Sequence, residues 1–227
     1  MNTAGNHEGP GIQLEKSSTL KIKNVNFIGF KHAAIYADRV AGVDTTIDGC
    51  KITGTTGEHS SIDITSEGAN ITIINSIFES NILRSSGGSV FLDTANAIIK
   101  GCTFRNNTAG WGGGGLYIWE GKVIISDSVF IWNQGNHGGA IILMYVAAGS
   151  IIKSSNITDN IATGKGGGIF YKHGHGLTIE KDVIIKGNEA GIEGYGIDCD
   201  VSVKPTLPSS GFDDEIDTNC LQGLIMH

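Results

Sequence analysis

The chain has 227 residues, 34 of them glycine and only 3 proline, and its formal net charge is −7. Glycine without proline and without a Gly-X-Y period excludes a collagen-like or Pro/Gly-rich disordered chain. The negative charge argues against nucleic acid or an anionic membrane surface as a partner. No apolar run approaches the ~18 residues of a membrane span, so we expect no membrane insertion by this chain. The first residues also lack the basic and apolar stretches of a signal peptide.

Residues 1–10 form a lead-in, and a repeat follows. A large apolar residue recurs at steps of 25 to 28 residues. Identical residue types at a fixed period indicate units that stack on copies of themselves. The members of this column are Phe27, Ile52, Phe78, Phe104, Phe130, Ile157 and Ile185.

Two further apolar columns keep the same period. An isoleucine column runs from Ile22 to Ile179, and a third column opens alternating pairs such as Leu116-Tyr117-Ile118. Alternation with a period of two indicates strands, and no window holds a helical apolar stripe. A sandwich or meander would also contain frequent strands and turns. The fixed period instead favours an all-β solenoid over residues 11–200, with about seven to eight coils of ~26 residues each.

An asparagine column follows the large apolar column. We expect these side chains at a bend, with the asparagines in the left-handed conformation and their amides hydrogen-bonded from coil to coil as a structural ladder. Glycine pairs such as Gly87-Gly88 and Gly138-Gly139 are expected to supply positive φ at a tight corner. The ladder residues are Asn81, Asn107, Asn133, Asn160 and Asn188.

The four cysteines are of two kinds. Cys50 and Cys102 occupy inward positions two coils apart, at ~9.6 Å, which exceeds the ~7 Å reach of a disulfide. Cys199 and Cys220 bracket the segment 201–227, a C-terminal cap or linker, and are the candidate disulfide. That bridge would imply an oxidising compartment. The cysteine spacing matches no zinc pattern, so we expect no metal and no cofactor.

Three sequons give candidate glycosylation sites, at Asn70, Asn106 and Asn156. They would be used only in a eukaryotic secretory pathway.

Function is expected on the outward positions of the third column. There, aromatic side chains and carboxylates share one strand face, which suits sugar rings; a covering loop or neighbouring chain is the alternative. The candidate ligand-binding residues are Tyr36, Asp63, Phe91, Tyr117, Trp119 and Phe170.

The same face presents Asp38, Asp63 and Asp93. Adjacent coils place the first two about 8 Å apart, within the ~6.5–9.5 Å separation of an inverting glycosidase. A carbohydrate-active hydrolase or lyase is therefore the alternative function. The seven histidines show no ligand spacing, and His173 and His175 are expected in an exposed turn.

A second outward column contains Ile98, Ile124 and Ile151. Stacked outward isoleucines indicate an assembly face, because a soluble monomer rarely exposes a continuous apolar patch. Homo-oligomers or head-to-tail filaments are therefore expected as partners, since solenoid ends present open strand edges. The stacked threonine and isoleucine side chains of this column also resemble the surface of an ice-binding solenoid.

The units Phe-x-x-Asn and Gly-Gly-Ala-Ile, best seen at 130–133 and 138–141, resemble the polymorphic outer-membrane-protein repeat of chlamydial surface proteins. The resemblance covers roughly residues 11–199. It implies a right-handed parallel β-helix and an extracellular or cell-surface role as an adhesin or structural module. For such a protein we expect a glycan or a host cell-surface receptor as a partner, and the resemblance carries over no catalytic residues. The asparagine is missing from the first two units, and no autotransporter barrel follows.

Overall fold

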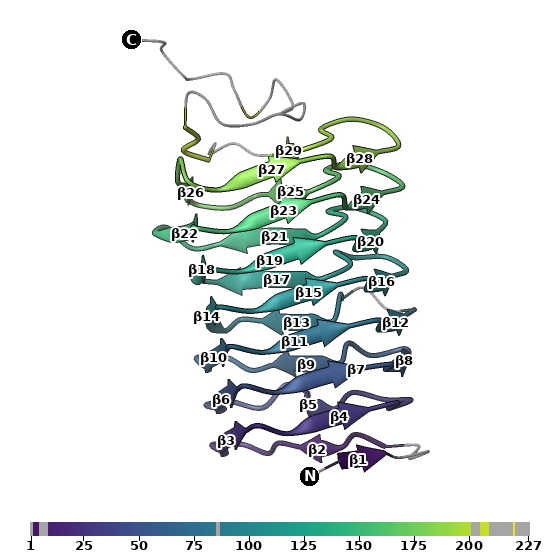
Figure 1. Ribbon diagram of the computed structural model, residues 1–227. Coiled ribbons are helices and arrows are strands. Elements are labelled where there is room, and N and C mark those ends of the chain that lie inside the picture. The colour runs from purple at the N-terminus through teal and green to yellow at the C-terminus, as the bar shows by residue number, and fades with distance from the viewer. Residues whose placement is uncertain (1, 5–8, 85–86, 201–204, 209–219, 221–227) are drawn as a thin grey trace.

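The computed structural model describes residues 2–4, 9–84, 87–200, 205–208 and 220. The chain forms a right-handed parallel β-solenoid of about seven turns, with ~26 residues in each turn (Figure 1). Among the described residues all the strand pairs are parallel, and each joins a strand to its equivalent in the next coil. The expected solenoid is therefore confirmed.

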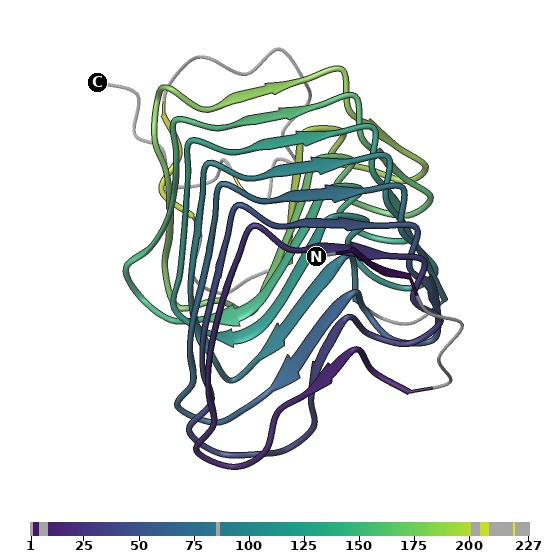
Figure 2. The same ribbon diagram turned by 60° about the horizontal axis from the view of Figure 1, so that its bottom comes forward.

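The coils wind through four sheets, which we name A to D. Figure 2 shows the coils superposed around a common interior. Sheet B contains β2 (Ile12–Gln13), β5 (Ile35–Ala37), β9 (Ile62–Thr65), β13 (Val90–Asp93), β17 (Leu116–Gly121), β21 (Ile141–Val146), β25 (Ile169–Lys172) and β29 (Ile197–Asp200). Sheet C contains β3 (Thr19–Lys23), β6 (Asp44–Asp48), β10 (Asn70–Ile74), β14 (Asn96–Lys100), β18 (Val123–Ser126), β22 (Ser150–Lys153) and β26 (Leu177–Ile179).

Sheets A and D complete the coil. Sheet A contains β1 (Asn2–Ala4), β4 (Asn26–Ile28), β7 (Lys51–Thr53), β11 (Ile77–Glu79), β15 (Thr103–Arg105), β19 (Val129–Ile131), β23 (Asn156–Thr158) and β27 (Ile184–Lys186). Sheet D contains the two-residue strands β8 (Thr56–Gly57), β12 (Ile82–Leu83), β16 (Thr108–Ala109), β20 (Gln134–Gly135), β24 (Ile161–Ala162) and β28 (Glu189–Ala190). Because β1 pairs with β4, the first strand of sheet A lies within the lead-in.

The apolar columns line the interior. The rings of Phe78 and Phe104 are 4.7 Å apart and nearly parallel, and those of Phe104 and Phe130 are 4.6 Å apart. These spacings match the ~4.8 Å between paired strands, so each ring stacks on the ring of the next coil. Cys50 and Cys102 are buried free thiols in this core, and burial raises the pKa of Cys102 to about 11.

The corner between sheets A and D carries the asparagine ladder. Each Nδ2 donates to the next Oδ1, at 2.9 Å from Asn81 to Asn107 and again from Asn107 to Asn133. The ladder continues through Asn160 to Asn188. Each of these Oδ1 atoms also accepts the backbone N–H of the preceding asparagine, so the amides replace the strand hydrogen bonds that the corner lacks.

The expectation that these asparagines adopt the left-handed conformation is wrong. The residue before each one does so instead: Ser80, Asn106, Trp132, Asp159 and Gly187 have φ of 54°, 54°, 56°, 54° and 66°. That residue turns the chain, and the turn directs the following side chain into the interior, where its amide can reach the next coil.

The role expected for the glycine pairs is also wrong at most positions. Gly138 has positive φ, but Gly87, Gly88 and Gly139 do not. A Cβ on Gly139 would lie 2.3 Å from the carbonyl oxygen of Gly167, and one on Gly88 would lie 2.0 Å from that of Gly113. These glycines are required because the backbones of neighbouring coils approach too closely for any side chain.

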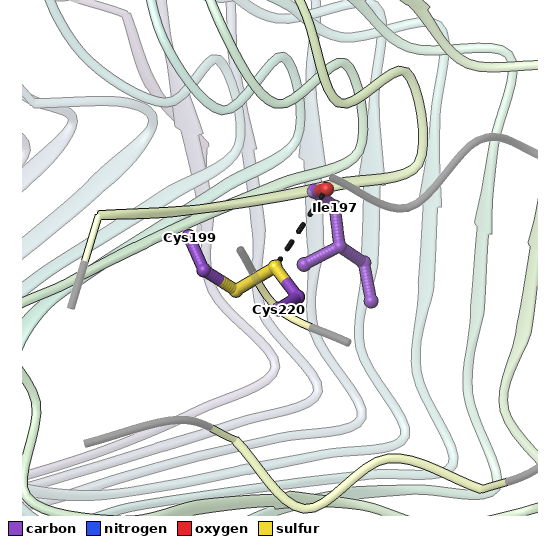
Figure 3. The surroundings of a disulfide bond; sticks show 3 residues. All are labelled: Ile197, Cys199 and Cys220. Carbon is purple, nitrogen blue, oxygen red and sulfur yellow. Dashed lines mark hydrogen bonds between the residues drawn. A yellow bond between two sulfur atoms is a disulfide. The ribbon is translucent and has the colours of Figure 1, made fainter. Parts of the chain in front are cut away.

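At the C-terminal end, a disulfide joins Cys199 of β29 to Cys220 (Figure 3). Thr206 exchanges backbone hydrogen bonds with Leu177 and Ile179 of β26, so the described part of the tail continues sheet C. Leu207 and Cys220 are buried against the core. The acidic Asp213-Asp214-Glu215 run lies outside the described residues.

Candidate functional site

Sheet B places the candidate residues on one outer face in exact register from coil to coil. Tyr36 pairs with Asp63, Asp63 with Phe91, and Phe91 with Tyr117. The column then continues through Ile142 and Phe170 to Asp198. Trp119 lies two residues beyond Tyr117 on β17, in register with Asp93.

This face is less open than the alternation alone suggests. Tyr117 is 7% exposed, Ile142 is 3% and Phe170 is 7%. They form a second apolar cluster outside the core, with Phe91, Trp119 and Met144 half-buried against it. Because the rings are wider than the spacing between strands, neighbouring side chains cover one another; the centroids of Phe91 and Tyr117 are 5.2 Å apart.

A cavity of about 470 Å³ lies over this cluster. Its floor comes from β17, β21 and β25, and its side from Trp111, His137 and Lys165 of the loops that precede those strands. Trp111 is 73% exposed. These three residues were not predicted from the sequence, although each directly precedes a glycine of the repeated glycine segment. The complete lining is Trp111, Tyr117, His137, Ile142, Met144, Lys165, Phe170 and Lys172.

Basic groups give this cavity, the larger of two on the outer face of sheet B, a positive character. Lys165 and Lys172 both line it, and Lys165 forms an ion pair with Glu193. His137 stacks on Phe170 at 5.1 Å. Burial lowers the pKa of His137, and the charges of Lys165 and Lys172 lower it further. The His137 imidazole, lying beside an aromatic ring and two ammonium groups, is suited to binding hydroxyl or anionic groups.

A second cavity, of about 270 Å³, lies nearer the N-terminus on the same face. Within it, Nδ1 of His59 lies 3.1 Å from Oδ2 of Asp63. Burial raises the pKa of Asp63, while hydrogen bonding to His59 partly offsets the rise. The lining is Tyr36, Asp38, Glu58, His59, Ser60, Asp63, Gly87 and Phe91.

Two of the seven histidines meet across adjacent coils. His32 and His59 stack with ring centroids 4.1 Å apart, and Tyr36 meets both rings edge-on at 5.0 Å. They are 27 residues apart, which is one coil, so the repeat period could have predicted their contact. His173 and His175 are exposed, as expected.

Two of the three candidate catalytic carboxylates line the same cavity. Asp38 and Asp63 line the smaller cavity, but Asp93 is not part of that lining. Asp93 lies beyond Phe91 on β13, where burial and the charge of Glu120 raise its pKa. Within the described residues, no three histidine, cysteine or acidic side chains form a group that could hold a metal ion.

The other candidate residues lie elsewhere on the surface. Ile98, Ile124 and Ile151 are in register on the outer face of sheet C; Ile98 is 44% exposed and the other two are half-buried. A shallow hollow of about 200 Å³ includes Ile98, Ile124 and Lys122. The sequon residues Asn70, Asn106 and Asn156 are exposed. In the part of the chain that the structure describes, no helix has the length and hydrophobicity to span a bilayer.

Comparison with known proteins identifies one family. The family model described as "right handed beta helix region" matches residues 10–135 and 90–207, which together span most of the chain. Searches of curated proteins and of solved structures give no match.

Proposed function

Because the chain belongs to the right-handed β-helix family, whose repeat builds a scaffold and specifies no chemistry, we propose that it acts through the outer face of sheet B as a non-enzymatic carbohydrate-binding module of a cell surface. The larger cavity is the observation that carries this proposal. It combines the exposed ring of Trp111 with Tyr117 and Phe170 below it and two lysines at its side. Aromatic surface with a few placed polar groups is typical of small-molecule sites, and the apolar faces of sugar rings pack on such surface.

A cell-surface location is supported by the disulfide between Cys199 and Cys220, because disulfides persist in oxidising compartments. The resemblance of the repeat to that of chlamydial surface proteins points to the same place and to an adhesin or structural role. The apolar column of Ile98, Ile124 and Ile151 supports self-association as part of that role. Sedimentation at micromolar concentration would distinguish a monomer from a filament.

Glycan binding is tested by comparing two exposed tryptophans. Trp111 lines the cavity, whereas Trp132 is 58% exposed at the corner between sheets A and D. On a glycan array, and by calorimetry with the best ligand, Trp111→Ala should weaken binding by about tenfold or more, as truncation of a central aromatic contact does. The control Trp132→Asn keeps a residue that tolerates the positive φ of 56° and should leave binding unchanged. Equal affinities for the parent and both variants would overturn the proposal.

Hydrolysis of a polysaccharide is the second candidate function, because Asp63 and Asp38 share a cavity and burial raises the pKa of Asp63. A carboxyl group with a raised pKa beside a second carboxylate is the acid–base arrangement of many glycosidases. Incubation with a panel of polysaccharides, followed by assays for reducing ends and unsaturated sugars, would detect such activity. Activity that disappears in Asp63→Asn would replace the binding proposal with the enzymatic one.

A further inference from the structure

The two cavities on the outer face of sheet B have opposite charge. The larger is lined by Lys172 and by Lys165, which forms an ion pair with Glu193, and its lining includes no carboxylate. The smaller is lined by three carboxyl side chains, Asp38, Glu58 and Asp63, and by no lysine or arginine. This difference sets which chemical group each cavity can accept.

A buried hydroxyl group in the smaller cavity has no partner. Ser60 is 1% exposed and lines the cavity, yet its Oγ makes no hydrogen bond within the described part of the chain. A buried hydroxyl without a partner is destabilising, so an occupant that offers a donor or acceptor there is favoured. This orphaned group is independent of the carboxylates, and it points to a polar ligand.

Rings form the wall of the smaller cavity. Tyr36 and Phe91 both line it, and the stacked imidazoles of His32 and His59 hold Tyr36 edge-on. Burial raises the pKa of Tyr36, and the charges of Asp38 and Asp63 raise it further. The charges of Asp38 and Asp63 therefore reach the Tyr36 ring. A cation placed against this ring would be stabilised both by the two carboxylates and by the face of the ring.

Two arginines lie near Asp38 and Glu58, the two more exposed carboxylates of the smaller cavity. Arg39 lies 3.9 Å from Asp38 and Arg84 lies 3.8 Å from Glu58, and all four side chains are at least 56% exposed. Exposed pairs at such distances contribute little and exchange readily with another cation. The side chain of Asp63 is only 15% exposed and has His59 as its neighbour, so it supplies the innermost negative charge.

We propose that the smaller cavity binds the protonated amine of an amino sugar, with the ammonium group at Asp63 and Asp38, a sugar hydroxyl at Ser60, and the apolar face of the sugar ring against Tyr36 and Phe91. The inference rests on the proposed function and adds to it a second site on the same face, which selects glycans that carry unacetylated amino groups. The cavity volume of about 270 Å³ suits one sugar unit of a longer chain. A lysine side chain carries the same charge but offers neither a ring for the aromatic wall nor a hydroxyl for Ser60.

The test compares glucosamine hexamer, its fully N-acetylated counterpart and a lysine hexapeptide by calorimetry at pH 6. The parent protein should bind the amine hexamer at least tenfold more tightly than the acetylated one, as expected for a charge-assisted contact. Asp63→Asn should abolish this preference, and Ser60→Ala should reduce affinity for the amine hexamer several-fold. The control Asp127→Asn removes one charge at an exposed turn whose φ of 52° asparagine tolerates, and it should leave both affinities unchanged.

The outcomes separate this inference from the function on which it rests. Equal binding of both hexamers would overturn the amine site and leave carbohydrate binding intact, and binding of neither would count against both. A lysine hexapeptide that binds as tightly as the amine hexamer would overturn the sugar assignment. A preference that survives in a folded Asp63→Asn variant, with the fold checked by circular dichroism, would overturn the placement at this cavity.

Discussion

The corner between sheets A and D and the outer face of sheet B belong to the same coils but differ in how strictly they repeat. At the corner, five successive coils place an asparagine at the equivalent position, and each of the first four amides donates to the amide of the next coil. On sheet B, equivalent positions hold Tyr36, Asp63, Phe91, Tyr117 and Ile142. Strict repetition therefore marks the residues that hold the coils together, and its loss marks the surface available for recognition.

The largest expected effect is on the corner. Asn107→Ala leaves the backbone N–H of Asn81 and the carbonyl oxygen of Phe78 without their partners. Each orphaned buried group costs about 1–3 kcal/mol, so the free energy of unfolding should fall by about 2–6 kcal/mol, with no change in glycan binding. Denaturant unfolding measures the loss. The adjacent Asn106→Gly is the control: Asn106 is exposed, glycine accepts its φ of 54°, and stability should be nearly unchanged. Equal stability of both variants would contradict the conclusion that the asparagine ladder stabilises the fold.

Substitutions can also distinguish glycines required by close backbone packing from glycines required by positive φ, and we expect smaller losses of stability than for Asn107→Ala. Gly139→Ala forces a Cβ against backbone atoms of Gly167 and Ile161, and should cost about 1–3 kcal/mol or more. Gly29 has φ of 69° and open space around its Cα, so Gly29→Ala should cost about 1–2 kcal/mol from backbone strain alone.

Asparagine distinguishes the two causes. Gly29→Asn should recover much of the loss, because asparagine tolerates the left-handed region, whereas Gly139→Asn should be worse than Gly139→Ala. Thermal melts of the four variants measure this. Recovery at position 139 would show that the coils can separate there.

The smallest expected effect, on sheet B, depends on pH. Burial raises the folded-state pKa of Asp63 above its unfolded value of about 3.9, so the folded protein binds this proton more tightly. The stability of the parent relative to Asp63→Asn should therefore fall as the pH rises from about 4 through the raised pKa, and then stay level. Amine binding should change in the opposite direction, because it requires the carboxylate.

Chemical denaturation and calorimetry across this pH range measure both quantities. Tyr36, Asp38, Glu58 and His59 share the cavity with Asp63. Making the comparison in a His59→Gln background removes the histidine titration. A stability difference that is independent of pH would show that Asp63 is ionised without cost.

Much of the scaffold followed from the sequence. The spacing of Phe78, Phe104 and Phe130 predicted one strand per coil in equivalent places, and the rings stack in that register. The pairing of Cys199 with Cys220 was also expected, and the structure contains it. Such features are predictable because each depends on a residue and on its copy one coil away. The loop contributions of Trp111, His137 and Lys165 were not predicted, since loop positions carry no alternation to show which way a side chain points.

The sequence by itself determined the period, the strand faces and the inward columns, because burial of apolar side chains at fixed intervals admits one way of stacking the coils. Only the tertiary structure decided which outward residues are accessible. Tyr117 and Phe170 alternate like exposed residues but are nearly buried, because each lies against a neighbouring coil and the loops beside it. His32 and His59, 27 residues apart, meet for the same reason: the solenoid places side chains one turn apart within contact distance, and their chemistry arises only there.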